Sequence, residues 1–506
     1  MESPAPSPST PNVPAGRAAH PQLERGMGLG GAVALNMLDM IGVGPFITIP
    51  LIVAAMGGPQ AMLGWILGAL LALCDGLVSA ELGASMPRAG GPYEYLKQIY
   101  GASGLGRLIS FLFVWQLSFS APLSIATGCI GLADYAGYLW PPLRTPWFHY
   151  SLVVPIPLLG ALRADVAFTP GTLAAIGCCG LAVLLLYRHI GGVGRVTRFL
   201  WGGVLLTVAW IVFAGVTHFD PHRAFSFPPG AFQFSSGFFL GLGGALLISI
   251  YDYWGYYNIC YLGGEVRDPE RNIPRAVLYS ILAVAAIYIV MNISLLGVVP
   301  WQEMLPGGVA SAQLSVVSVM MQRIYGSWAG QLVTLLIIWT AFGSIFSLLL
   351  GYSRVPYAAA LDGNFFAAFR RLHPRHKFPH VSLVALGLTA MAFCFFQLVQ
   401  VIAALVVIRV LLQFSLQQFG LLWLRWKHPE VPRPFRMWLY PVPVLVAIIG
   451  FLYVVVSRHE FGQQLRLAVL IAAAGVVLYM WRAVRRREWP FVIPGRPPGE
   501  AERAPL

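Results

Sequence analysis

The stretch Met40–Pro50, "MIGVGPFITIP", lies inside an apolar run, Leu35 to Met56, that is about long enough to span a bilayer. It contains two glycines and two prolines, the residues least suited to a helix interior. A helix interrupted at membrane depth frees backbone N–H and C=O groups that lipid cannot satisfy, and such breaks are tolerated where they line a cavity. The stretch therefore predicts a membrane helix whose broken backbone serves a binding site.

The composition excludes a soluble globular chain. Of the 506 residues, 57% are hydrophobic and only 10% are charged, whereas an average soluble domain carries about 25% charged residues. The alternating pattern of a β-barrel is absent, so we predict an all-α integral membrane protein with twelve transmembrane helices. The predicted spans are 29–54, 60–84, 108–137, 170–188, 196–217, 237–262, 275–299, 329–352, 380–397, 401–424, 438–457 and 465–484. The apolar piece Ser151–Leu162 is too short to span and contains two prolines, so we expect an interfacial segment there.

The formal net charge of +13 comes from basic residues that are unevenly distributed between the two sides of the membrane. When the amino terminus is placed inside, the inner segments hold most of the basic residues. The outer segments hold only Arg144, Arg163, Arg223, Arg323, Arg458 and Arg466. This asymmetry is the positive-inside rule, and it predicts a plasma-membrane protein with both termini cytoplasmic. The basic residues therefore do not indicate a nucleic-acid partner.

The sequence lacks the residue patterns of nucleotide hydrolysis, nucleophilic catalysis and metal binding. The chain has no G-x-x-x-x-G-K-[ST] motif, no recognisable nucleophile–base–acid set, and six cysteines without metal-ligand spacing. We therefore expect no enzyme activity, no catalytic residues, no metal site and no cofactor. The Pro/Ser/Ala-rich residues 1–26 predict a disordered cytoplasmic tail and not a signal peptide. The function classes that remain are a secondary transporter and, with less support, a sensor.

A second break is expected in the sixth helix. The segment "GFFLGLGGALLISIYDYWGYYNICYLGGEV" (Gly237–Val266) carries a mid-span cluster, Tyr251–Gly255, that includes an acidic residue. One glycine in a membrane helix usually reflects close packing. Two breaks at corresponding positions of two repeats instead indicate the substrate and ion site of a secondary transporter.

Five motifs in order resemble the amino acid–polyamine–organocation permeases, which have a LeuT-like fold. Besides the Gly42–Gly44 turn, they are "AELGASMPRAGGPYEYLKQIYG" (Ala80–Gly101), "GGEVRDPERNIPRA" (Gly263–Ala276), "SRVPYAAALDG" (Ser353–Gly363) and "PEVPRPFR" (Pro429–Arg436). The resemblance implies a transporter core over 27–425, with inverted five-helix repeats at 27–217 and 237–425 in which helices 1 and 6 are broken. Two additional helices in 426–487 and a cytoplasmic tail over 488–506 follow.

The resemblance also implies which residues bind substrate. Backbone amides at the first break would bind a substrate carboxylate, and backbone carbonyls at the second would bind its amino group. The residues concerned are Ile41, Gly42, Val43, Gly44 and Pro45, and Tyr251, Asp252, Tyr253, Trp254 and Gly255. Tyr253 aligns with an aromatic residue that closes over the substrate. Glu81 and Glu265, in the signature loops, are expected to stabilise a closed inner gate.

Three further features bear on the substrate and the coupling ion. Asp39 and Asp252 place two carboxylates near the membrane midplane, which suits a cationic amino acid, a polyamine or a coupling proton. Ser344 and Ser347 could offer oxygen ligands to a sodium ion, although serines in membrane helices often bond their own backbone. Arg409 is a basic residue well inside a span, and we expect it to pair with Asp252, or otherwise with Asp39, and to close the outer gate.

The sequence thus predicts a secondary active transporter of an amino acid that works by alternating access, coupled to H⁺ or Na⁺ or by exchange. A polyamine or other organic-cation permease of the same fold is the alternative. A non-transporting nutrient sensor is the alternative from another class. The expected partners are a small-molecule substrate and the lipid bilayer, while the oligomeric state is left open.

Overall fold

The computed structural model describes residues 23–102, 104–156, 160–188, 190–306, 310–397, 399–458 and 461–491. Most of the expected terminal tails, 1–26 and 488–506, lies outside these residues. The first half of the chain forms α1 (Leu29–Ile41), α2 (Gly44–Met56), α3 (Met62–Ser85), α4 (Pro92–Ile99), α5 (Leu105–Leu139), α6 (Pro170–Leu186), α7 (Ile190–Thr217), α8 (Pro221–Ala224), α9 (Ser236–Tyr253) and α10 (Asn258–Tyr261). The second half forms α11 (Pro269–Leu296), α12 (Ala310–Tyr325), α13 (Ser327–Tyr352), α14 (Arg354–Leu361), α15 (His380–Phe393), α16 (Val399–Arg409), α17 (Leu416–Lys427), α18 (Val442–Val456) and α19 (Phe461–Arg486).

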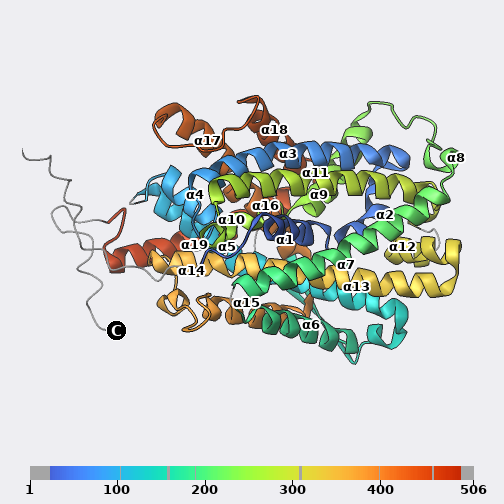
Figure 1. Ribbon diagram of the computed structural model, residues 1–506, viewed down its shortest axis with the longest axis horizontal. Helices are drawn as coiled ribbons and strands as arrows, with labels where there is room; N and C mark the ends of the chain where they lie inside the picture. Colours follow the sequence, from blue (N-terminus) through green and yellow to red (C-terminus); the bar gives the residue numbers. More distant parts are fainter. Residues whose placement is uncertain are drawn as a thin grey trace, which may run out of the picture.

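The helices form a multi-pass membrane bundle, as predicted. Within the described residues, eight helices are long and apolar enough to cross a bilayer, and the bent pair α1 and α2 makes a ninth. Three shorter apolar helices, α6, α15 and α18, lie where the sequence predicts spans 170–188, 380–397 and 438–457. The long helices run along the long axis of the molecule (Figure 1).

Both expected helix breaks are present. The pair α1 and α2 is bent by 45° across Gly42 and Val43. In the predicted sixth span, α9 ends at Tyr253 and the short α10 begins at Asn258. The predicted breaks therefore lie within the spans in which we expected them.

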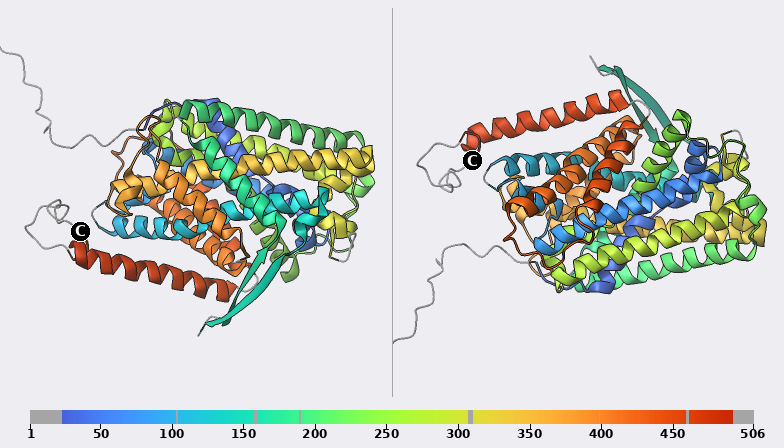
Figure 2. Two further views of the ribbon diagram at one scale, coloured as in Figure 1. Left: turned by 90° about the horizontal axis from the view of Figure 1, so that it is seen from below. Right: turned by 90° about the horizontal axis from the view of Figure 1, so that it is seen from above.

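The mostly helical structure, which agrees with the predicted all-α membrane fold, contains one short β-sheet that the sequence did not predict. The segment expected to be interfacial is a β-hairpin, in which β1 (Phe148–Ile156) pairs antiparallel with β2 (Gly160–Phe168). The two-residue strand β3 (Phe396–Gln397) adds to the other side of β2. Pro155 lies in β1, which is an edge strand, the position in a sheet where proline is tolerated. The hairpin projects from the bundle beside one end of α19 (Figure 2).

The first helix lies in the middle of the bundle. It packs against α7, α11 and α13, with α3, α9 and α11 on one side of it in Figure 1 and α6 and α15 on the other. By contrast, α19 runs along the outside (Figure 2), and only 22% of its most apolar stretch is buried. The central position of α1 brings its break next to the elements that carry the second break.

Candidate functional site

The first break is a glycine turn followed by a new helix. Gly42 has φ +37°, a conformation that side chains disfavour, and it ends α1. Pro45 lies in the first turn of α2, where its missing N–H costs no intrahelical bond. A Cβ added to Gly42 would lie 3.0 Å from Ser344 Oγ on α13, while Thr340 Oγ1 donates to the Gly42 carbonyl at 3.0 Å. The turn is therefore packed tightly against α13.

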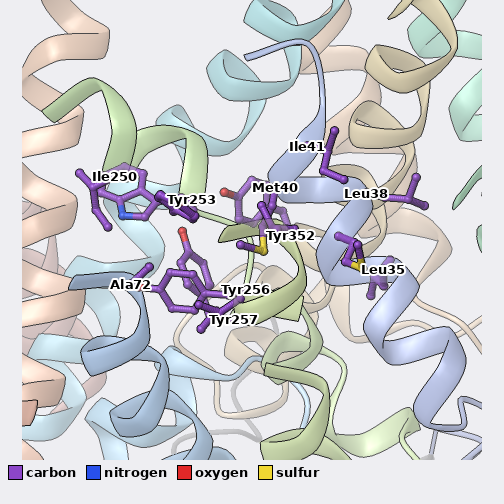
Figure 3. Packing of buried hydrophobic residues seen from close by; sticks show 14 of the residues in the cluster. Leu35, Leu38, Met40, Ile41, Ala72, Ile250, Tyr253, Tyr256, Tyr257 and Tyr352 are labelled. Carbon is purple, nitrogen blue, oxygen red and sulfur yellow. The ribbon is translucent and has the colours of Figure 1, made fainter. Parts of the chain in front are cut away.

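The second break faces the first. Trp254 is extended after the end of α9, and Gly255 has φ +121°. A Cβ added to Gly255 would lie 2.8 Å from Asp39 Cβ on α1, closer than side chains approach. Figure 3 shows Met40 of α1 beside the tyrosines of the second break. The glycine at each break is therefore required by close approach as well as by backbone conformation.

Two polar side chains that the sequence analysis missed connect the breaks. The Tyr288 hydroxyl, on α11, lies 2.7 Å from the Met40 carbonyl and 3.2 Å from the Asp252 carbonyl. Asn36, on α1, donates to the Tyr256 carbonyl at 2.6 Å and accepts from the Ile259 N–H at 2.9 Å. The sequence does carry a signal for both residues, because each is a polar side chain within an apolar helix. Burying such a group in a membrane is costly and usually serves a function.

A third missed residue is the buried carboxylate of Asp75 on α3. Its Oδ1 accepts from Gln418 Nε2 at 2.7 Å, and its Oδ2 accepts from the Tyr256 hydroxyl at 2.7 Å. Asp75 thereby joins α3 and α17 to the second break. Like Asn36, it is a polar residue in an otherwise apolar stretch of helix.

Asp252 lies at the amino-terminal end of α2. Its Oδ2 accepts a short hydrogen bond from Thr48 Oγ1, and a Cβ added to Gly44 would collide with its Oδ1. A helix amino terminus carries partial positive charge from its unpaired N–H groups. The carboxylate of Asp252 therefore lies beside the first residue of this half-helix, where Thr48 donates to it.

The predicted Arg409–Asp252 ion pair is wrong. Arg409 Nη2 donates to Ser120 Oγ on α5 at 3.1 Å, and its guanidinium lies 5.5 Å from the centre of the Trp254 ring and 5.7 Å from that of Tyr352. Among the described residues, no carboxylate oxygen lies within ion-pair distance of Arg409, but its charge interacts with that of Asp39. The pair does not form because Asp252 turns toward α2 while Arg409 turns toward α5.

Arg409 faces a small cavity. Leu123, Ser124 and Tyr251 share its lining with Ser120 and Arg409, together with Ile402, Leu405 and Val406. Directly after Arg409 the chain continues as a π-helix, Val410–Ser415. This geometry is often found at functional sites. The cavity therefore combines one cation, three hydroxyl groups and an apolar wall.

The structure places Tyr253 away from this cavity. Its ring is fully buried, 6.1 Å from that of Trp65 and 5.1 Å from that of Tyr288 by centroid, and its hydroxyl bonds the Trp65 carbonyl at 3.3 Å. Tyr251 lines the cavity instead, and Trp254 lies against Arg409. The predicted lid role of Tyr253 is untested by these contacts and stays a prediction.

Of the other residues expected at the first break, Ile41 is fully buried in the core. Val43 packs toward α5, because a Cβ on Gly131 would lie 3.2 Å from Val43 Cγ1. These two side chains therefore pack within the bundle, and only the backbone of this segment remains available for the predicted role.

The two serines considered for sodium lie against α1. Ser347 Oγ donates to the Leu35 carbonyl at 2.8 Å and accepts from Asn258 Nδ2 at 2.9 Å. Ser344 Oγ bonds the Asp39 carbonyl at 3.4 Å. The hydroxyl oxygens of the two serines therefore lie next to carbonyl oxygens of α1. Whether these oxygens bind a sodium ion stays a prediction.

The two glutamates expected at the inner gate are both ion-paired. Glu265 accepts two hydrogen bonds from Arg354, at 2.7 and 3.0 Å, and both side chains are 2% exposed. Glu81 on α3 accepts from Arg425 Nε at 2.8 Å and from the Met437 N–H at 2.8 Å. Both pairs lie at the end of the bundle that carries α4, α14 and α17 (Figure 1), which is the end that the sequence places inside.

Two interrupted helices that face each other within a helical membrane bundle are found in many membrane transporters. The comparison with protein families is specific: the family described as amino acid permease matches residues 28–478. The chain belongs to this family, and it is a transporter and not an enzyme.

Curated relatives are similar over nearly the whole chain. The serine/threonine exchanger SteT of Bacillus subtilis is 26% identical over 462 residues, 90% of this chain and 96% of the relative. The branched-chain amino acid permease BcaP of the same organism is 24% identical over 85% of this chain and 86% of the relative. The human Asc-type amino acid transporter 1 is 26% identical over 91% of this chain and 83% of the relative. All three are amino acid transporters.

Proposed function

We propose that this amino acid permease is a secondary active transporter that moves an amino acid across the plasma membrane by alternating access. The observation that carries the proposal is the contact between the two helix breaks, where Gly255 packs on Asp39 and Tyr288 bonds backbone carbonyls of both. A small tilt of α9 relative to α1 would change this contact without unfolding either helix. Such a junction suits a site that opens to each side in turn.

Two further features support alternating access. The buried Glu265–Arg354 pair and the Glu81–Arg425 pair lie at the expected inner end and support its closure in this state. The cavity at Arg409 instead involves Ile402 near the start of α16, in the half of that span which the topology places toward the outside. In the proposed cycle, the inner ion pairs break when the protein opens to the cytoplasm.

The proposal includes twelve spans in two inverted repeats, with both termini cytoplasmic. Nine candidate spans and three shorter apolar helices support the count. Breaks in the first helix of each proposed repeat support the symmetry. The distribution of basic residues supports the orientation.

Arg409 favours an amino acid over a polyamine as substrate. A guanidinium in the lining of the cavity repels a polycation, and Asp252 already accepts from Thr48. The proposed substrate is therefore an amino acid.

The coupling ion is part of the same proposal. Na⁺ would use the hydroxyls of Ser344 and Ser347 with α1 carbonyls, whereas H⁺ would use Asp39 or Asp252. Exchange needs neither ion, and the name of SteT describes an exchanger.

Uptake by purified protein in proteoliposomes tests the function. The panel contains serine, threonine, branched-chain amino acids and a polyamine, with an imposed Na⁺ gradient, an imposed H⁺ gradient, or internal amino acid alone. We expect uptake of at least one amino acid and no polyamine uptake. Stimulation by a gradient identifies the coupling ion, and stimulation by internal amino acid alone identifies exchange. Binding of an amino acid without uptake under all three conditions would replace the transporter by a sensor.

A further inference from the structure

A strongly basic loop, residues 362–379, connects α14 to α15. Its one acidic residue, Asp362, is bound by Lys97 at 2.7 Å. Its four basic residues are all exposed, namely Arg370, Arg371, Arg375 and Lys377. Arg371 also interacts electrostatically with His380, the first residue of α15. The loop therefore places a concentrated positive charge at the expected inner end of α15.

The inner end of α6 meets this loop. The ring of Tyr187, directly after α6, lies 5.3 Å from that of His373 and 5.1 Å from that of Phe378 by centroid. The next residue, Arg188, is exposed as well. We call Arg188 and the four basic residues of the loop the basic patch.

The segments that carry the basic patch supply no counter-charge of their own. The sequence contains no acidic residue between Asp165 and Asp220, and none between Asp362 and Glu430. In the part of the chain that the structure describes, none of the five basic side chains forms an ion pair. Like charges this close together repel one another and attract anions from outside the protein.

An apolar surface adjoins the basic patch. The helices α6 and α15 lie side by side (Figure 1), and a Cβ added to Gly387 would lie 2.5 Å from Val183 Cγ2. The residues that follow these two, Leu184 and Leu388, are 70% and 60% exposed. Leu184 precedes Arg188 by four residues, which is about one helical turn. In a bilayer these leucines face lipid tails.

We propose that the basic patch and the adjoining leucines of α6 and α15 bind an anionic phospholipid of the inner leaflet. Basic clusters at the cytoplasmic ends of membrane helices attract anionic headgroups, and an arginine guanidinium donates two parallel hydrogen bonds to a phosphate. A soluble anion would use only the charged half of this surface, whereas a lipid fits both halves. The inference goes beyond transport, and it rests on the cytoplasmic placement of this loop in the proposed function.

Native mass spectrometry of the full-length protein, released from detergent, tests the site. The probes are phosphatidylglycerol, phosphatidylcholine with the same tails, and glycerol phosphate, which keeps the phosphate and lacks the tails. We expect phosphatidylglycerol to bind about 10- to 100-fold more tightly than phosphatidylcholine, and the preference should fall as salt is added before analysis. Glycerol phosphate at equal concentration should not displace the lipid.

Two triple variants locate the site. The loop variant, Arg371→Gln/Arg375→Gln/Lys377→Gln, should bind the two lipids equally. The matched control is Arg267→Gln/Arg271→Gln/Arg275→Gln, which removes the same charge from exposed residues at the expected inner end. These residues lie at the start of α11, on the other side of α1 from α6 and α15 (Figure 1), so the preference should remain. Arg371→Lys/Arg375→Lys keeps the charge and should keep most of the preference.

The outcomes also separate the lipid site from transport. Equal loss of preference in both triple variants would show a general effect of net charge and overturn the site, and displacement by glycerol phosphate would replace the lipid by a soluble anion. Equal binding of both lipids to wild-type protein that still takes up amino acids would overturn this inference alone. A lipid preference without uptake would overturn the transport function alone. Reaction of Phe366→Cys, in the same loop, with an impermeant maleimide on intact cells would place the loop outside and overturn the inner-leaflet site.

Discussion

At the residue scale, Gly44 of α2 lies directly beside the Asp252 carboxylate near the end of α9. A side chain at position 44 would occupy the space of the Asp252 carboxylate, and that carboxylate is held by Thr48. Close packing of this kind explains why a small residue is required here beyond any preference for a flexible backbone.

We expect Gly44→Val to abolish uptake and Gly44→Ala to reduce it strongly, because overpacking costs about 1–3 kcal/mol and displaces Asp252. Uptake normalised to the amount of protein in the membrane measures the effect. Gly177→Ala is the matched control, since a Cβ there meets nothing within 4 Å. Normal transport by Gly44→Val would contradict the assignment of this turn to the site.

Tyr253 permits a test between a lid and a core role. Its ring is fully buried against Trp65 and Tyr288, so Tyr253→Ala should destabilise the protein by about 3–5 kcal/mol, as large aromatic truncations do. Tyr253→Phe keeps the ring and loses only the bond to the Trp65 carbonyl, so most activity should remain.

Thermal unfolding in detergent and the KM for uptake, measured on the same variants, separate the two roles for Tyr253. A core role lowers the unfolding temperature, whereas a lid role raises KM at unchanged stability. Tyr251→Ala is the comparison, because Tyr251 lines the cavity and is 38% exposed. If Tyr253→Phe fails as badly as Tyr253→Ala, its hydroxyl is the important group.

At the scale of elements, α11 couples the two broken helices through one hydroxyl. Tyr288 bonds the Met40 carbonyl, at the end of α1, and the Asp252 carbonyl, near the end of α9. Both carbonyls are freed by the breaks, and the single O–H of Tyr288 donates a hydrogen bond that the two carbonyls share, closer to Met40 than to Asp252.

Tyr288→Phe should lower uptake, because the lost hydrogen bond contributes about 0.5–1.5 kcal/mol and a buried carbonyl remains unpaired. The control is Tyr279→Phe on the same helix, whose side chain is 54% exposed in the bundle. Uptake and unfolding temperature are measured for both variants. Equal effects of the two substitutions would contradict a bridging role for Tyr288.

The buried Glu265–Arg354 pair between the loop after α10 and α14 belongs to the same scale. Glu265→Gln leaves the Arg354 charge unpaired at 2% exposure, and breaking such a pair costs about 3–5 kcal/mol. We expect Glu265→Gln/Arg354→Gln to be more stable than either single variant. Thermal unfolding of the three variants forms a double-mutant cycle.

The exposed Arg323–Glu303 pair is the matched control for this cycle, since partly exposed pairs contribute about 0–1 kcal/mol. Additive losses at Glu265 and Arg354 would show that the two side chains are not coupled. If the pair also stabilises the closed inner end, the double variant should alter the rate of uptake while restoring stability.

At the scale of the whole molecule, the arrangement predicts a sidedness. The hairpin lies beside the end of α19 that is farther from α4 and α14 (Figures 1 and 2), and the basic residues place α4 and α14 inside. A membrane-impermeant maleimide should therefore label Tyr150→Cys on intact cells, because Tyr150 is 56% exposed. Phe366→Cys, at a position 72% exposed near α14, should react only after permeabilisation. The reverse pattern would invert the topology.

The local physics of the chain determined much of this structure. Runs of apolar residues must form helices in a bilayer, and glycine and proline within such runs must interrupt them. The multi-pass helical bundle and both breaks could therefore be predicted. The hairpin could not, because β1 obtains its hydrogen bonds from β2 and not from its own sequence neighbours.

The sequence by itself determined that Asp252, Arg409, Glu81 and Glu265 are charged groups in places where charge is costly, and hence that each needs a partner. Only the tertiary structure decided which partner each one has. Asp252 accepts a hydrogen bond from Thr48 beside the first residue of α2. Arg409 donates to Ser120 and lines a cavity. The physical reason is that partners in space come from helices far apart in the chain, and a change in helix rotation directs a side chain to a different neighbour.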